Sequence, residues 1–181
     1  MSSTIKNIAV LASGNGTNFQ AIIDRGIIVN KVLTNNPKAG IIERAKNSGH
    51  EVIVVKPLND ERLNYHLEGT DLIVLAGWMR ILSPEFCKQW EGKIINIHPS
   101  ILPAFKGSIH AIEDAFNYGC KVFGATVHWV TPEVDGGEII DQRAITINNE
   151  SLEVVEDMVH RYVEHIMYPQ TIKQLIKNGN I

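Results

Sequence analysis

Short apolar runs alternate with amphipathic stretches along the first two thirds of the chain. Each run consists largely of Ile, Val, Leu and Ala and is closed by Gly, Pro, Ser or Asn. Uninterrupted runs of this kind are typical of strands buried on both faces, as in a parallel sheet. They predict five strands, at Ile8–Ala12, Lys31–Thr34, Glu51–Val55, Leu72–Ala76 and Ile94–Ile97.

Helices are predicted between these strands. The segments are Thr17–Asp24, Ala39–Ser48, a segment that begins at Ser83-Pro84, and Ile109–Tyr118. Ser83 suits an N-cap, Pro84 suits the first helical position, and Gly49 suits a C-cap. The alternation predicts an α/β fold with a Rossmann-like, doubly wound and mostly parallel sheet.

The last third of the chain has a different pattern. Val122–Val130 and Glu138–Ile147 alternate over a longer span, which predicts two late antiparallel strands. Apolar residues three and four apart then predict a helix over Ser151–Asn178. Pro169 lies inside it and predicts a kink or break.

Composition narrows the class of protein. The 181 residues are 44 % hydrophobic and 20 % charged, which indicates a globular chain with a single domain over residues 1–181. The net charge, 17 − 20 = −3, argues against a nucleic-acid partner. Residues 1–7 are polar, and no window approaches ~20 apolar residues, so neither a targeting segment nor a membrane span is expected. We therefore expect a cytoplasmic protein. We expect it to be a monomer or a homodimer.

Cysteine and histidine spacings predict no metal site. Cys87 and Cys120 are too few for a disulfide framework or a Cys-based zinc site, and Cys87 is expected to be a buried small hydrophobe. His110, His128, His160 and His165 form no ligand pattern, and the last two are five apart, which is wrong for one face of an α-helix.

A glycine-containing loop follows the first predicted strand and opens a helix. Its sequence is Ser13-Gly14-Asn15-Gly16-Thr17-Asn18. Backbone N–H groups and a helix N-terminus suit a phosphate monoester. The loop lacks the third glycine of a dinucleotide fingerprint and the lysine of a P-loop. A phosphate site and a plain strand-to-helix turn both stay open.

Two further segments carry residues suited to acyl chemistry. Asn96 and His98 alternate at the end of an apolar strand, so they point the same way, and an amide beside an imidazole can stabilise an oxyanion. The alternative is a strand-end histidine bonded to backbone. Asp135 lies in Val134-Asp135-Gly136-Gly137, where it either makes a turn or orients an imidazole.

A fourth segment, Ala76-Gly77-Trp78-Met79-Arg80-Ile81-Leu82, leaves a strand at the same edge of the sheet. Its apolar residues are suited to line a flat-ligand pocket or to pack in the core. Taken together and in order, the four segments resemble the phosphoribosylglycinamide formyltransferase family, folate-dependent enzymes of purine synthesis, over about residues 5–170.

The resemblance implies formyl transfer from 10-formyltetrahydrofolate to the amine of glycinamide ribonucleotide, without a metal. By match to the family motifs, it implies Asn96, His98 and Asp135 as the catalytic set. The implied ribonucleotide-binding residues are Gly14, Asn15, Gly16, Thr17, Asn18 and Glu164. The implied folate-binding residues are Arg62, Met79, Arg80, Ile81, Leu82, Asn96 and Val134.

The residue types fit this chemistry. Asn96 and a protonated His98 would stabilise the charge on the formyl oxygen, each donor contributing roughly 3–4 kcal/mol. Asp135 would favour the imidazolium and hold water for proton transfer. The loop at Lys106–His110 is one residue longer than is usual in the family, so no role is assigned to His110.

Three rival functions remain. Methionyl-tRNA formyltransferase and formyltetrahydrofolate hydrolase share the folate chemistry but normally carry a further domain, which 181 residues are not expected to hold. A non-catalytic nucleotide-binding module would keep the glycine loop without needing Asn96, His98 and Asp135 together.

Overall fold

The computed structural model describes residues 5–179, so the first four residues of the polar segment 1–7 lie outside the described part. Seven strands form one sheet in the order β3-β2-β1-β4-β5-β6-β7. The strands β1 to β5 pair in parallel, and β6 and β7 pair antiparallel. The predicted α/β fold with a doubly wound, mostly parallel sheet and antiparallel late strands is therefore confirmed.

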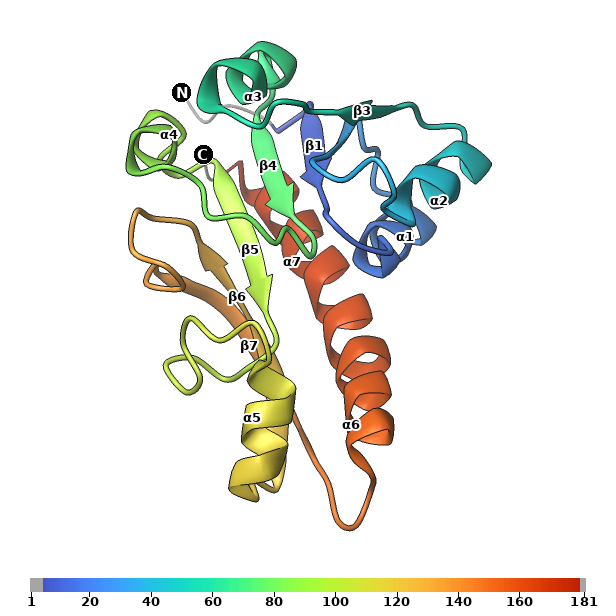
Figure 1. Ribbon diagram of the computed structural model, residues 1–181, viewed down its shortest axis with the longest axis vertical. Coiled ribbons are helices and arrows are strands. Elements are labelled where there is room, and N and C mark those ends of the chain that lie inside the picture. Colours follow the sequence, from blue (N-terminus) through green and yellow to red (C-terminus); the bar gives the residue numbers. More distant parts are fainter. Residues whose placement is uncertain (1–4, 180–181) are drawn as a thin grey trace.

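The strands lie close to the predicted apolar runs. Their bounds are β1 Ile8–Leu11, β2 Lys31–Thr34, β3 Val52–Val54, β4 Leu72–Leu75, β5 Ile94–His98, β6 Val122–Trp129 and β7 Ile139–Thr146. The helices are α1 Thr17–Asp24, α2 Ile41–Asn47, α3 Asp60–Leu67, α4 Pro84–Gln89, α5 Ala111–Tyr118, α6 Leu152–Met158, the π-helix η1 Val159–Glu164 and α7 His165–Asn178. Figure 1 shows α6 and α7 as one long run along the sheet.

The sheet is covered on both faces, as continuous apolar strands require. Ile8 and Val10 of β1 face the cluster that holds α1, α2 and α7, while Ala9 and Leu11 face α3 and α4. A third cluster joins α5, α6 and the start of β6. Among the described residues, no helix combines the length and the apolar character needed to cross a membrane.

Helix α3 had no counterpart in the sequence prediction. Its start is set by Asn59, whose side chain accepts a hydrogen bond from the N–H of Arg62, and by two acidic residues in the first turn. The helix α4 begins as predicted, with the Ser83 hydroxyl accepting from the N–H of Phe86 and Pro84 at the first position.

A kink or break was expected at Pro169, and the break is wrong. Pro169 lies inside α7, which continues to Asn178. The irregularity lies upstream, where Val159–Glu164 is π-helical. A π-helix has i→i+5 hydrogen bonds and wider turns, so the chain departs from α-helical geometry before the proline rather than at it.

The strand order places a crevice between β1 and β4. The order reverses there, and in open α/β sheets ligands bind beyond the carboxyl ends of the strands at such a point. The N–H of Ser13 donates to the carbonyl of Gly77 at 3.0 Å, and the Ser13 hydroxyl accepts from the N–H of Met79 at 2.9 Å. The loops after β1 and β4 are thus held side by side.

Candidate active site

A cavity of about 620 Å³ lies at this crevice. All four segments singled out in the sequence contribute to its lining. The predicted site residues that line it are Gly14, Asn15, Gly16, Thr17, Asn18, Met79, Arg80, Ile81, Leu82, Asn96, His98, Val134, Asp135 and Glu164. Arg62 lies on α3 with its side chain exposed and is not among the lining residues.

The loop after β1 presents backbone to the cavity. Gly16 ends the loop with φ +72°, and a Cβ there would lie 2.7 Å from the side chain of Ile41. Only glycine fits this combination of left-handed backbone and close packing. No side chain of the described residues caps the N-terminus of α1, so the first N–H groups of the helix are open to a ligand.

Asn96 and His98 lie on β5, two residues apart, and both reach the cavity. The register pairs Asn96 with His128 of β6, and the Asn96 amide nitrogen lies 3.3 Å from Nε2 of His128. Nδ1 of His128 donates to the carbonyl of Trp129 at 2.9 Å. Sequence reasoning missed His128, and the signal that could have found it is its place opposite Asn96 in the antiparallel pair.

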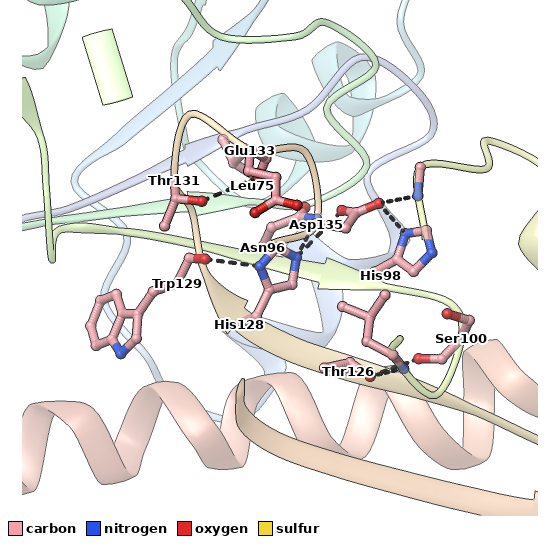
Figure 2. Close-up of polar contacts among 12 residues, drawn as sticks. Leu75, Asn96, His98, Ser100, Thr126, His128, Trp129, Thr131, Glu133 and Asp135 are labelled. Carbon is pink, nitrogen blue, oxygen red and sulfur yellow. Dashed lines mark hydrogen bonds and ion pairs between the residues drawn. The ribbon is translucent and has the colours of Figure 1, made fainter. Parts of the chain in front are cut away.

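The carboxylate of Asp135 lies between the two imidazole rings (Figure 2). Oδ2 is 3.3 Å from Nδ1 of His98, and Oδ1 is 3.5 Å from Nε2 of His128. Burial raises the pKa of the Asp135 carboxyl, but the hydrogen bond from His128, the N–H of Gly107 and the charges of both histidines outweigh burial. The pKa therefore lies below its ordinary value, and Asp135 is an anion at neutral pH.

The loop after β5 contacts both His98 and Asp135 through its backbone. The carbonyl of Phe105 lies 3.1 Å from Nε2 of His98, and the N–H of Gly107 donates to Oδ2 of Asp135 at 2.9 Å. Both ring nitrogens of His98 thus face acceptors. A neutral imidazole has one N–H, so only the imidazolium donates to both.

The loop that carries Asp135 leaves no room for larger residues. Asp135 has φ 49°, which Asp tolerates in a turn. A Cβ on Gly137 would lie 1.8 Å from the carbonyl oxygen of Trp129. The close approach of Gly137 to β6 fixes where Asp135 enters the cavity.

Glu164 lies at the far end of the cavity, beside the loop after β1. Its side chain is 4 % exposed, and Oε2 accepts from Asn18 Nδ2 at 2.9 Å and from His160 Nδ1 at 3.0 Å. His160 also lines the cavity. Because η1 is a π-helix, residues five apart share a face, and the rings of His160 and His165 stack with centroids 6.4 Å apart. The sequence-based statement that these two histidines cannot share a helix face is therefore wrong.

Apolar side chains surround the remaining wall. Met79, Ile81 and Val134 are exposed and line the cavity, which suits a flat ring system. The Cys87 thiol is buried, as predicted. Burial is the larger cause that raises its pKa, and the negative charge of Asp60 raises the pKa further. Within residues 5–179 no group of three or more His, Cys, Asp and Glu side chains is arranged to hold a metal ion.

Comparison with known proteins identifies the family. A model of the family described as formyl transferase matches residues 6–172. Phosphoribosylglycinamide formyltransferase of Bacillus subtilis is 40 % identical, with 97 % of this chain and 97 % of that protein covered. The trifunctional purine biosynthetic protein adenosine-3 of Bos taurus is 38 % identical over 96 % of this chain, which spans 18 % of that longer protein.

Solved structures agree. Phosphoribosylglycinamide formyltransferase from Anaplasma phagocytophilum superposes with a TM-score of 0.90 at 36 % identity, covering 95 % of this chain and 87 % of that one. The enzyme of the same name from Bacillus halodurans gives a TM-score of 0.88 at 37 % identity, covering 96 % and 97 %. The chain therefore belongs to the formyl transferase family and, within it, to the phosphoribosylglycinamide formyltransferases, enzymes of purine biosynthesis.

Proposed function

We propose that this protein transfers the formyl group of 10-formyltetrahydrofolate to the primary amine of glycinamide ribonucleotide. The observation that carries the proposal is the Asp135 carboxylate set between His98 and His128, beside Asn96, on the wall of the cavity that the Gly14–Asn18 loop also lines. An acyl-transfer group and a phosphate loop thus open into one space. The proposal covers one formyltransferase domain, acting in the cytoplasm.

The ribonucleotide occupies the end of the cavity formed by the loop after β1. Backbone N–H groups of Gly14–Asn18 and the open N-terminus of α1 hold its phosphate. Oε2 of Glu164 already accepts two hydrogen bonds, so Oε1 is the oxygen that accepts from the ribose hydroxyls. Binding at these two points directs the amine toward β5.

The folate occupies the apolar wall. The cavity volume and the exposed side chains of Met79, Ile81 and Val134 fit a flat ring, and the backbone of Met79–Leu82 supplies polar groups for its edge. When bound, it supplies an activated formyl group. The proposal does not rest on Arg62, whose contact with folate stays a prediction.

The catalytic roles follow from the hydrogen-bonding capacity of each group. The Asn96 amide donates to the formyl oxygen as negative charge develops there, and the positive charge of the His98 imidazolium stabilises that oxygen while its two N–H groups stay on Asp135 and the Phe105 carbonyl. The Asp135 anion stabilises the charged ring of His98 and accepts a proton from the attacking amine, directly or through water, for delivery to the leaving nitrogen. Nε2 of His128 lies within 3.5 Å of the Asp135 carboxylate and 3.3 Å of the Asn96 amide nitrogen, and it contacts Asp135 as a donor or Asn96 as an acceptor.

The test is formyl transfer by purified protein given both substrates, with the formylated ribonucleotide measured by mass spectrometry. We expect one formylated product per tetrahydrofolate formed, and at least a ~100-fold lower turnover for His98→Ala. Folded protein that makes no product would overturn the proposal. Formate release without acceptor would indicate a hydrolase, and formylation of methionyl-tRNA would indicate the tRNA enzyme instead.

A further inference from the structure

His160 lies in the wider turns of η1, next to the carboxylate of Glu164. Its side chain is 46 % exposed and borders the cavity, and Nδ1 donates to Oε2 of Glu164 at 3.0 Å. The family chemistry described above gives this histidine no role. It is the cavity's one imidazole outside the group around Asp135, within the described lining residues.

The negative charge of the Glu164 carboxylate opposes binding of a phosphate at this end of the site. It is almost fully buried and is hydrogen-bonded to Asn18, a residue of the loop proposed to hold the phosphate. A phosphate dianion bound to that loop would therefore lie near a desolvated anion. Like charges in a partly buried site repel strongly unless a cation offsets one of them.

His160 is suited to supply that cation. The hydrogen bond to Glu164 raises the pKa of His160, burial lowers it, and the negative charges of Glu164, Glu156 and Asp157 raise it further, so the pKa lies above 6.5. Burial lowers the pKa of the stacked ring of His165, so as pH rises His165 loses its proton before His160 does.

Other elements packed near this turn carry few competing charges. Strands β6 and β7 pack against η1. The ionisable residues that they carry there are His128 on β6, and Asp141 and Arg143 on β7. Asp141 and Arg143 pair with each other at 3.8 Å. Arg44 of α2 acts on His165 and donates to the carbonyl of Asn15. Glu164 is thus the partner that His160 contacts.

We propose that His160 is a positioning residue for the ribonucleotide, whose imidazolium holds the Glu164 carboxylate and offsets its charge beside the phosphate loop. This inference rests on the proposed function. The charged ring favours binding of the phosphorylated substrate, while the neutral ring keeps its Nδ1–H but loses the electrostatic part. The chemistry at His98 and Asp135 lies elsewhere in the cavity and is unaffected.

The experiment compares the wild-type protein with His160→Gln over a range of pH. The ratio of the two KM values for glycinamide ribonucleotide cancels the titration of the substrate itself. We expect the KM of His160→Gln to be about tenfold higher than that of the wild type well below the pKa of His160. The two KM values should become equal as pH rises through that pKa. The kcat values of the two proteins should stay equal.

A second variant separates charge from shape. His160→Arg keeps a permanent positive charge, so its KM should remain low and should lose the pH dependence attributed to His160. His66→Gln, on the distant helix α3, is the matched control and should follow the wild type. A KM ratio near one at every pH, in wild-type protein that does transfer formyl groups, would overturn the inference. Absence of transfer by the wild type would overturn the proposed function instead.

Discussion

The replacement Asp135→Asn tests the centre of the proposed mechanism. It keeps the size of the side chain and an oxygen that accepts from the N–H of Gly107, but it removes the charge between the two histidines. The ribonucleotide end of the cavity is untouched. The expected result is therefore a loss in kcat, with little change in KM for the ribonucleotide.

The size of the loss follows from the contact between Asp135 and His98. At 3.3 Å and an effective dielectric constant of ~20, a carboxylate and an imidazolium attract by about 5 kcal/mol. The amide replaces this charge with a dipole, so we take roughly half of the attraction as lost. The resulting loss of about 2.5 kcal/mol corresponds to a ~70-fold lower kcat.

The assay measures formylated ribonucleotide at saturating concentrations of both substrates. Asp24→Asn is the matched control, because Asp24 is an exposed carboxylate on α1 that pairs only with Gln20 among the described residues. A cooperative thermal unfolding transition above the assay temperature in each variant would show that both are folded. A kcat for Asp135→Asn within about threefold of the wild type would refute the role assigned to the charge.

Three further predictions concern stability and loop geometry. The lowered pKa of Asp135 means that its ionised carboxylate stabilises the fold at pH values above the unfolded-state pKa of 3.8, and that this effect is lost as pH falls through the lower folded-state pKa. The difference in unfolding free energy between the wild type and Asp135→Asn, measured in urea titrations, should therefore shrink as pH falls below 3.8. Gly137→Ala should cost about 1–3 kcal/mol of stability and lower kcat, because its Cβ would collide with the Trp129 carbonyl and displace the Asp135 loop; unchanged kcat would contradict this. Tyr168→Phe should cost about 1–2 kcal/mol in thermal or urea unfolding without changing KM, since the buried hydroxyl donates to the carbonyls of Leu75 at 2.8 Å and Ile95 at 3.2 Å.

The sheet and the position of the site could be predicted from local sequence. Continuous apolar runs such as Leu72–Leu75 can be buried only between two layers, which makes the sheet parallel and doubly wound. The carboxyl ends of such strands meet at one edge, so the loop after β1 and the residues Asn96 and His98 had to lie near one another.

The partners of these residues depend on register and backbone shape, which single-sequence patterns do not set. His128 meets Asn96 only in one antiparallel register, next to an irregularity in the pairing at Val127 and His128. The approach of Asp135 depends on a left-handed residue and on the contact of Gly137 with β6. Neither feature has a periodic signal.

The π-helix η1 is a second feature that the sequence pattern does not predict. Apolar residues of the last helical run follow ordinary helical spacing, so the pattern gives no sign of the widened turns at Val159–Glu164. Those turns bring His160 to the cavity and onto the same face as His165. The position of a side chain on an irregular turn does not follow from regular helical spacing.

The buried carboxylates of this cavity lie against histidines rather than against lysine or arginine. Two carboxylates, Asp135 and Glu164, are buried in its wall, and each is held by histidine: Asp135 by His98 and His128, Glu164 by His160. Among the described lining residues, Arg80 is the only Lys or Arg, and it belongs to the segment proposed to bind folate. Histidine loses its charge near neutral pH, whereas Lys and Arg do not. Binding of a phosphorylated substrate should therefore depend on pH through His160, and His160→Gln should remove that dependence while leaving kcat at β5 unchanged.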